Sequence, residues 1–320
     1  MVDVLVAGAI NWDINLFVRK FPQPGEETPV PRITRVPGGK AGNVSVAVAR
    51  LLGPHRVGIL GALGRDDVAD VQKRLLREEG VDTFTIVVKP DRESGQAYII
   101  TDGSGENVIY TYFGANAALT PADVLSEGTR KVIESARITA ITDPPEETLE
   151  EIAEIAHDAG RRIAWDPGVR AEAGIERLRK VLLRTDYLFL NEIEVEQMTG
   201  LREPQDAARH LSEIKSDLIT IMKRGKEGCT MFKGPATIRV PGIDLTKHGL
   251  RVVNTVGCGD AFLGAFSAAK ALGLGDEEAL HWANWAGALK ATKPETRGSP
   301  TRAELDKWIE DTRFSEERRT

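Results

Sequence analysis

The chain has 320 residues, enough for one substantial hydrophobic core with a smaller subdomain. Its 41% hydrophobic and 28% charged residues are typical of a globular protein. The net charge of −6 argues against nucleic acid as the main partner, because phosphate backbones attract a cationic surface. Apolar runs fall short of the ~20 residues that span a bilayer, and the N-terminus lacks the features of a signal peptide. Two cysteines, Cys229 and Cys258, cannot build a disulfide framework, so we expect a cytoplasmic protein without a membrane segment.

The first 120 residues combine helical and strand patterns with two β-rich stretches. A short apolar run and helical spacings ended by glycine predict strands at 2–8 and 57–60 and helices at 42–52 and 68–79. The stretches at 16–36 and 86–113 alternate between apolar and polar residues and contain turn signals. We expect them to form one small accessory sheet.

From residue 121 onward, helices and strands alternate regularly. The predicted helices are 121–134, 146–159, 175–184, 192–199 and 205–214, and the predicted strands are 138–142, 162–166, 187–191 and 218–223. Helices at 263–272 and 279–291 follow. Strands separated by helices imply a parallel sheet covered on both faces. The predicted fold class is therefore α/β, a three-layer αβα domain with a mainly parallel sheet plus a small β-sheet.

Polar side chains follow several of these strands. In an open parallel sheet, ligands bind beyond the carboxyl ends of the strands. The residues predicted at that edge are Asn11–Asp13, Asp143, Asp166, Asn191 and Lys223. Their convergence predicts a binding site.

The segment 254–262, Asn-Thr-Val-Gly-Cys-Gly-Asp-Ala-Phe, is the sharpest local feature. The small residues Gly257, Cys258 and Gly259 let backbone N–H groups face a concavity, and the helix that begins here adds its positive end. Such a place stabilises an anion or a phosphoryl group. Asp260 would then accept a proton from a hydroxyl nucleophile. Alternatively, Asp260 is an N-cap residue and the glycines form a tight turn.

The segment 37–43, Pro-Gly-Gly-Lys-Ala-Gly-Asn, leads directly into a predicted helix. Its glycines allow a ligand to approach the backbone, while Lys40 offers a cation and Asn43 a paired hydrogen-bonding group. The lysine does not have the spacing of a P-loop. The segment beginning at Gly8 does not match the dinucleotide-binding fingerprint either, which counts against a dehydrogenase.

Together these two segments resemble the two signatures of the ribokinase (PfkB-type) carbohydrate kinase family. Further matching motifs occur in the family's order, at 11–13, 21–26, 61–67, 114–120, 191–194 and 223–228. The resemblance extends over most of the chain and implies a single ribokinase-like kinase domain over 1–320. It also implies a lid subdomain from about 13–36 and 86–114 that closes over the sugar, and a homodimer formed through the lid.

The resemblance implies a kinase that transfers the terminal phosphoryl group of a nucleotide to a hydroxyl of a small sugar or polyol. Asp260 is then the catalytic base, and the amides of Gly257, Cys258 and Gly259 form the anion hole. Glu194 would help to hold Mg²⁺ through water. The donor would be ATP, with ADP as the alternative.

Site residues also follow from the resemblance. Acceptor contacts are assigned to Asn11, Asp13, Gly39, Lys40, Asn43 and Asp143, and nucleotide contacts to Asn191, Lys223, Gly225, Gly228 and Asn284. Asp143 is one methylene shorter than the glutamate of ribokinases, and it either holds a different substrate or none. Asn284 is otherwise a residue on the face of a helix.

Two departures limit the transfer. Asn254 stands where many members have an aspartate that binds an activating monovalent cation, so potassium dependence is left open. Cys258 replaces the usual alanine of the anion hole, where its amide would still serve.

Lys40 favours the ribokinase-like branch, but a nucleoside kinase and a sugar-phosphate kinase, for example for ribose 1-phosphate, stay open. The latter needs extra cations near the acceptor, and Lys89, Arg92 and Arg170 are the candidates, each otherwise a surface charge. A non-catalytic sugar-binding regulator is the alternative from another class.

Overall fold

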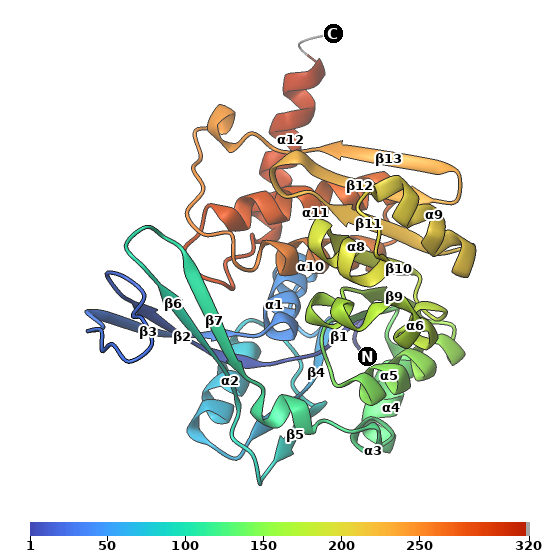
Figure 1. The fold of residues 1–320 in the computed structure, drawn as a ribbon. Coiled ribbons are helices and arrows are strands. Elements are labelled where there is room, and N and C mark those ends of the chain that lie inside the picture. The colour runs from blue at the N-terminus through green and yellow to red at the C-terminus, as the bar shows by residue number, and fades with distance from the viewer. Residues whose placement is uncertain (318–320) are drawn as a thin grey trace.

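The computed structural model describes residues 1–317, with side chains to residue 310. Its main sheet contains β1 (Val4–Ala7), β4 (Val57–Gly64), β5 (Ile86–Lys89), β8 (Ile138–Ile141), β9 (Arg162–Trp165), β10 (Tyr187–Asn191), β11 (Ile219–Lys223), β12 (Gly228–Lys233) and β13 (Ala236–Pro241). The strand order is β13-β12-β11-β10-β9-β8-β1-β4-β5 (Figure 1). The strands from β11 to β5 pair in parallel, and β12 and β13 form an antiparallel hairpin at one edge.

Helices cover both faces of this sheet (Figure 1). One face carries α1 (Lys40–Leu52), α2 (Asp67–Glu78), α10 (Cys258–Ala271), α11 (Asp276–Ala291) and α12 (Arg302–Glu317). The other carries α3 (Pro121–Val124), α4 (Glu127–Ser135), α5 (Glu146–Asp158), α6 (Gly174–Arg177), α7 (Arg179–Leu182), α8 (Glu192–Thr199) and α9 (Pro204–Ile214). The predicted three-layer αβα fold is confirmed.

The pattern of the central strands explains the two cores. Successive side chains of a strand point to opposite faces, so Val4 and Val6 of β1 pack under α1 and α10, whereas Leu5 and Ala7 pack under α5. All four residues are buried. A strand buried on both faces appears in the sequence as a continuous apolar run, which is why residues 2–8 are recognisable as a strand.

The small sheet has the order β3-β2-β6-β7 and contains β2 (Asn11–Phe17), β3 (Arg32–Gly38), β6 (Gly95–Thr101) and β7 (Asn107–Tyr112). The sequence placed 86–114 in this sheet as one stretch. Ile86–Lys89 instead pairs with β4 of the main sheet, in the register Gly61↔Ile86. The reason is topological, because β4, α2 and β5 form one strand–helix–strand unit whose second strand lies beside the first.

Four local differences from the sequence expectations concern helices and a hairpin. The helix expected at 121–134 is divided into α3 and α4 at Ser126, whose ψ of 138° is extended. The helix expected at 175–184 is divided at Leu178. The hairpin of β12 and β13 was not predicted, and neither was α12.

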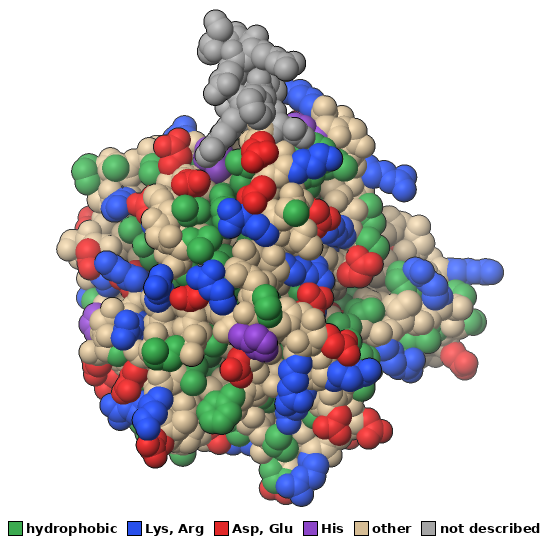
Figure 2. Space-filling model, turned by 180° about the vertical axis from the view of Figure 1, so that it is seen from behind, with side chains coloured by type: hydrophobic (Ala, Val, Ile, Leu, Met, Phe, Trp, Pro, Cys, Tyr) green, Lys and Arg blue, Asp and Glu red, His purple; other side chains and the backbone are tan. Residues whose placement is uncertain are grey.

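The surface carries interspersed charges. On the face seen in Figure 2, acidic and basic side chains alternate, with hydrophobic side chains scattered among them. No helix within residues 1–317 is long and apolar enough to cross a membrane. The small sheet differs from the rest of the surface, because all six residues of β7 are exposed and four of them are large and apolar or aromatic: Val108, Ile109, Tyr110 and Tyr112.

Candidate active site

Two lysines from different elements meet on one buried carboxylate at the carboxyl edge of the main sheet. Asp166 directly follows β9 and is 5% exposed. Its Oδ1 lies 3.5 Å from Nζ of Lys40, the first residue of α1, and its Oδ2 accepts a hydrogen bond from Nζ of Lys223, the last residue of β11. The edge rule of parallel sheets therefore brought together Asp166 and Lys223, 57 positions apart, and Lys40 joins them from the start of α1.

The charges of this cluster stabilise one another. Burial by itself would raise the pKa of Asp166, but the ammonium groups of Lys223 and Lys40 outweigh it and lower that pKa. Burial likewise disfavours the charged form of Lys40, yet Asp166, Asp143 and Asp260 raise the pKa of Lys40 overall. Lys40 therefore keeps its positive charge in the crevice, where an anionic ligand can meet it.

Asp260 lies in the first turn of α10, beside the N-terminus of that helix. Its Oδ2 accepts a hydrogen bond of 2.8 Å from Nδ2 of Asn43 on α1. Burial raises the pKa of Asp260, and the charge of Lys40 and the bond from Asn43 work in the opposite direction. A carboxylate with a raised pKa is a better proton acceptor than an ordinary aspartate.

The turn that leads into α10 requires glycine. Gly257 is the N-cap residue with φ of 88°, and a β-carbon there would lie 2.4 Å from the carbonyl oxygen of Thr296. Lys223 reaches the same turn, since its Nζ is 3.8 Å from the position that a β-carbon on Gly259 would take. Backbone amides at the positive end of a 14-residue helix and a lysine thus face one place.

Glu194 and Asn191 form a reciprocal cap at the start of α8. The backbone N–H of Asn191 donates to Glu194 Oε2 at 2.8 Å, and the N–H of Glu194 donates to Asn191 Oδ1 at 2.9 Å. Glu194 Oε2 also lies 3.9 Å from Nζ of Lys223. Burial and the charge of Asp166 raise the pKa of Glu194. The spacing predicted from the sequence is therefore a helix cap, and the cap directs Glu194 toward the lysine cluster.

The small sheet contributes Asp13, which is 4% exposed and lies against Gly38 of β3. Burial raises the pKa of Asp13 to about 7, with Arg297 opposing and Asp260 adding to the shift. Asp13 and Asp260 therefore belong to one electrostatic site, although Asp13 comes from the small sheet and Asp260 from helix α10. The sequence placed Asp13 among the acceptor contacts, and this location is compatible with that role.

Arg297 connects the parts of this site. It is buried, its Nε donates to Asn43 Oδ1 at 3.3 Å, and its Nη2 donates to the carbonyl of Gly38 at 2.8 Å. Burial lowers the pKa of Arg297 to about 10. The guanidinium therefore orients the amide of Asn43, whose Nδ2 is left to face Asp260.

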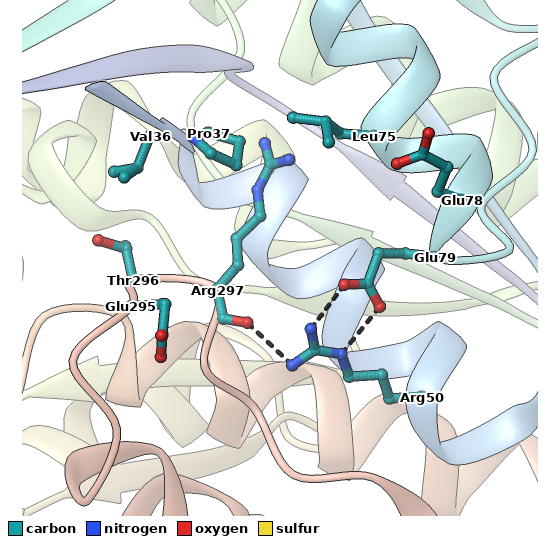
Figure 3. Close-up of a pocket in the computed structure, with 9 residues that line it drawn as sticks. All are labelled: Val36, Pro37, Arg50, Leu75, Glu78, Glu79, Glu295, Thr296 and Arg297. Atoms are coloured by element: carbon teal, nitrogen blue, oxygen red, sulfur yellow. Dashed lines mark hydrogen bonds and ion pairs between the residues drawn. The ribbon is translucent and has the colours of Figure 1, made fainter. Parts of the chain in front are cut away.

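Figure 3 shows how this arginine is held. Its side chain extends between Pro37 and Leu75 along a cavity of about 270 Å³, and its backbone carbonyl accepts a hydrogen bond of 2.9 Å from Arg50. Arg50 in turn pairs with Glu79 at 2.6 Å. This arrangement fixes the segment that follows α11 against α1 and α2.

The remaining acceptor-side residues are Asn11 at the start of β2, Gly39 before α1 and Asp143 shortly after β8. Asn11 Oδ1 accepts a hydrogen bond from Asn116 Nδ2 at 2.9 Å, and Asp143 Oδ1 accepts one from the N–H of Ala9 at 3.0 Å. Gly39 has φ of 83°, and a β-carbon there would lie 2.4 Å from the N of Asn11. Asn11 and Asp143 are thus oriented by protein groups, each with a second side-chain oxygen or nitrogen still able to bind a ligand.

The nucleotide-side residues divide into two groups. Asn191 and Lys223 belong to the cluster described above. Gly225, with φ of 51°, lies in the turn that leads into β12, and Gly228, with φ of 96°, is the first residue of that strand. Asn284 on α11 donates its Nδ2 to the carbonyl of Pro241 at 2.8 Å, which ties the helix to the hairpin. Within the described part of the chain, no hydrogen bond or ion pair joins Gly225, Gly228 or Asn284 to Asp260.

Some residues of the site were missed at the level of family motifs. Asp166 follows a predicted strand, and the strand-end rule alone had identified it. Asn116 lies within the matching motif at 114–120, although the hydrogen bond that it accepts from the N–H of Ile10 spans 106 positions. Arg297 carries no local signal, because its partner Asn43 is 254 positions away. Gln72, buried on α2, accepts from Arg297 and donates to the carbonyl of Asn11, and it too appears in the sequence as an ordinary helix residue.

A proton acceptor beside a helix N-terminus, with two lysines facing the same crevice, suits the transfer of a phosphoryl group to a hydroxyl. The fold and the site thus define a phosphotransferase with an alcohol acceptor. The family profile described as "pfkB family carbohydrate kinase" matches residues 1–302, and the chain belongs to that family.

Individual relatives agree with this assignment. An ATP-dependent ribose-1-phosphate kinase of Halopiger xanaduensis is 30% identical over 301 residues, 94% of this chain and 96% of the relative. A ribokinase structure from Thermotoga maritima has a TM-score of 0.85 at 25% identity and covers 97% of this chain and 100% of that one. The structure of Arabidopsis thaliana ribokinase with ribose and ATP has a TM-score of 0.84 at 24% identity, covers 96% and 98%, and shows the same fold.

Proposed function

We propose that this protein is a Mg²⁺- and nucleotide-dependent kinase that phosphorylates a hydroxyl of a small sugar or polyol, with ATP as donor. The observation that supports it best is the Asp260 carboxylate, which has a raised pKa and lies in the first turn of α10 within hydrogen-bond distance of Asn43. In the step proposed, Asp260 takes the proton of the acceptor hydroxyl, whose oxygen forms the new bond to phosphorus. The bond to the leaving nucleotide breaks, and its electron pair leaves with the nucleotide.

The chain's own groups stabilise the charge of this step. We assign the amides of Gly257, Cys258 and Gly259 to the transferred phosphoryl group and Lys223 to the donor phosphates. Lys40 fits the crevice between acceptor and donor, because it reaches Asp166 and its charge interacts with Asp260. Gly225, Gly228 and Asn284 stay proposals for the nucleotide's ribose and base.

Glu194 is the residue best placed for magnesium. Mg²⁺ keeps several waters and binds through one or two carboxylates and the substrate phosphates. Asp166 is occupied by two lysines, whereas Glu194 has one backbone bond and a lysine at 3.9 Å. Bound magnesium would neutralise charge on the donor phosphates.

A cytoplasmic location stays a prediction from the sequence.

The small sheet is proposed to act as a lid. It carries Asp13 and Asn11 on its inner side and reaches the main domain through Gly38. Its outer strand β7 exposes an apolar row that a second copy of the chain would cover, and we therefore keep the homodimer through this sheet as a proposal.

A sugar phosphate is the second candidate acceptor, and Arg170 favours it. Of the three cations considered from the sequence, Lys89 is paired with Asp123 at 2.6 Å and Arg92 lies near Phe113 and Gly114. Arg170 is half-buried, and its Nε donates to the carbonyl of Pro144 at 3.1 Å, directly beside Asp143. Its guanidinium has two further NH₂ groups with which to meet a phosphate at the acceptor side.

A coupled phosphoryl-transfer assay tests the function. Purified protein is supplied with Mg²⁺ and ATP or ADP, and with ribose, ribose 1-phosphate, fructose, inositol and nucleosides in turn. Turnover on one sugar or polyol supports the proposal, turnover on nucleosides alone contradicts it, and silence on every acceptor with nucleotide still bound supports a regulator instead.

Arginine variants distinguish ribose from ribose 1-phosphate. R170A should raise KM for ribose 1-phosphate by about tenfold or more while leaving KM for ribose nearly unchanged, because a charged hydrogen bond to phosphate is lost. R177A is the matched control, since Arg177 is exposed and pairs with Glu146 on the outer helices. Equal effects of R170A on both acceptors would remove the argument for a phosphate contact.

A further inference from the structure

Lys290 is the only lysine of the described side chains with no exposed surface, at 0%. It lies near the end of α11, one residue before the helix ends. Its ammonium donates a hydrogen bond of 2.9 Å to the carbonyl oxygen of Asn254 and reaches the carbonyl of Lys293 at 3.5 Å. An ammonium is costly to bury unless its hydrogens are bonded, so this contact has a structural purpose that a surface lysine would not have.

The two carbonyls belong to two segments that meet beside the anion hole. Asn254 precedes the Gly257 turn by three residues, and Lys293 begins the segment that leads to Arg297. The backbone N–H groups of Val253 and Asn254 donate to the carbonyl of Ala291 at 2.7 and 3.1 Å. The ammonium therefore lies where the segment before the anion hole is held against the end of α11.

The side chain of Asn254 completes this junction. Its Nδ2 donates to the carbonyl of Pro294 at 2.8 Å, and its Oδ1 accepts from the N–H of Val256 at 3.0 Å. A carboxylate at position 254 could not donate the first of these bonds. Lys290 and Asn254 thus donate N–H hydrogen bonds to backbone carbonyl oxygens. Oxygens of this kind can also bind an alkali cation.

The charge of Lys290 also acts on residues of the proposed anion hole and on the proposed base. Burial lowers the pKa of Lys290, and the neighbouring charges of Glu295 and Asp260 oppose that shift. The Lys290 charge in turn acts on the Cys258 side chain, at the first residue of α10. A fixed positive charge behind the anion hole favours negative charge in front of it.

We propose that the Lys290 ammonium is a built-in cation that holds the anion-hole segment, so that phosphoryl transfer by this chain needs no added monovalent cation. Lys290 is in this account a positioning residue, since it acts through Asn254 and the Gly257 turn. The turnover test of this proposal rests on the proposed kinase function. A second test, which measures thermal unfolding, does not.

Two variants separate the charge from the space it fills. K290M keeps the length of the side chain without the charge, and K290A leaves room for a small cation. Both should lower kcat by about tenfold or more, with the acceptor KM changed less than about twofold, because the contact serves the transition state and not acceptor binding. Potassium chloride or ammonium chloride should restore much of the turnover of K290A, whereas choline chloride at equal ionic strength should not. The wild-type rate should be unchanged by any of these salts.

K270M is the matched control. Lys270 also caps a backbone carbonyl, that of Leu274 at 2.9 Å, and pairs with Asp276, but at the far end of α10. K270M should keep the wild-type kcat and its indifference to potassium. Full turnover of K290M, loss of turnover in K290A without rescue, or stimulation of the wild-type enzyme by potassium would each overturn the proposal.

Thermal unfolding gives the readout that needs no substrate. Potassium should raise the Tm of K290A, because a cation that binds only the folded state stabilises it, and should not raise the Tm of the wild-type protein or of K270M. A wild-type protein without turnover on any acceptor would contradict the proposed function, and this Tm comparison would still decide the role of Lys290. If neither variant folds, the wild-type response to potassium decides, since a rise in its Tm or rate overturns the proposal.

Discussion

Replacing Asp260 with asparagine removes the proposed proton acceptor while keeping the size of the side chain. Asn43 can still donate its hydrogen bond of 2.8 Å to the oxygen of the new amide, so acceptor binding and the packing of α10 against α1 should persist. A positioned base contributes about 100- to 10,000-fold to the rate, which is about 3 to 5 kcal/mol of the barrier. We therefore expect kcat to fall within that range and the acceptor KM to stay nearly constant.

The D260N substitution should not lower the thermal stability of the protein. Burial raises the pKa of Asp260, which means that the folded protein bears a cost for the charged form at neutral pH. A neutral amide removes that cost, so the Tm of D260N should equal or exceed that of the wild-type protein. The wild-type kcat/KM should decrease as the pH falls through the raised pKa of Asp260, because the protonated carboxyl cannot accept a proton.

The assay is coupled turnover with the accepted sugar, together with a thermal unfolding scan of each variant. D70N is the control, because Asp70 also lies in the first turn of a helix, α2, but is exposed. Turnover of D260N within about threefold of the wild-type value would refute the assignment of Asp260 as base, since even a weak base contributes more.

Two further perturbations follow from buried groups of the site. The pKa of Asp13 is about 7 in the folded protein against 3.8 in the unfolded chain. The wild-type free energy of unfolding should therefore decrease as the pH rises between those values, by up to about 1.4 kcal/mol per pH unit. D13N should lack this contribution to the slope. Urea unfolding at several pH values measures this slope, and parallel curves for the two proteins would contradict the raised pKa of the buried Asp13 carboxyl. G39A should lower the unfolding free energy by more than the about 1–2 kcal/mol of a left-handed backbone, because its β-carbon would also lie 2.4 Å from the N of Asn11. G25A is its control, since Gly25 has φ of 88° but no atom within 4 Å of that position, and equal losses in both variants would show that the close approach adds nothing.

The sequence by itself determined the alternation of strands and helices, the class of fold and most of the segment proposed to be catalytic. Buried runs such as 2–8 and helical spacings such as 42–52 are properties of consecutive residues, and so are the glycines and the aspartate around residue 260. The strand-end rule extended this local information to Asp166 and Lys223, because parallel strands must end on a common edge.

The tertiary structure decided which distant residues share that edge. Ile86–Lys89 pairs with β4, although its own alternation suits either sheet. Arg297 orients Asn43 across 254 positions, and Lys290 reaches Asn254 across 36. Such contacts depend on the packing of α1, α10 and α11 on one face of the sheet, and no short stretch of sequence records that packing. The residues proposed to perform the chemistry are therefore visible in the sequence, whereas those that hold them in place appear only in the folded chain.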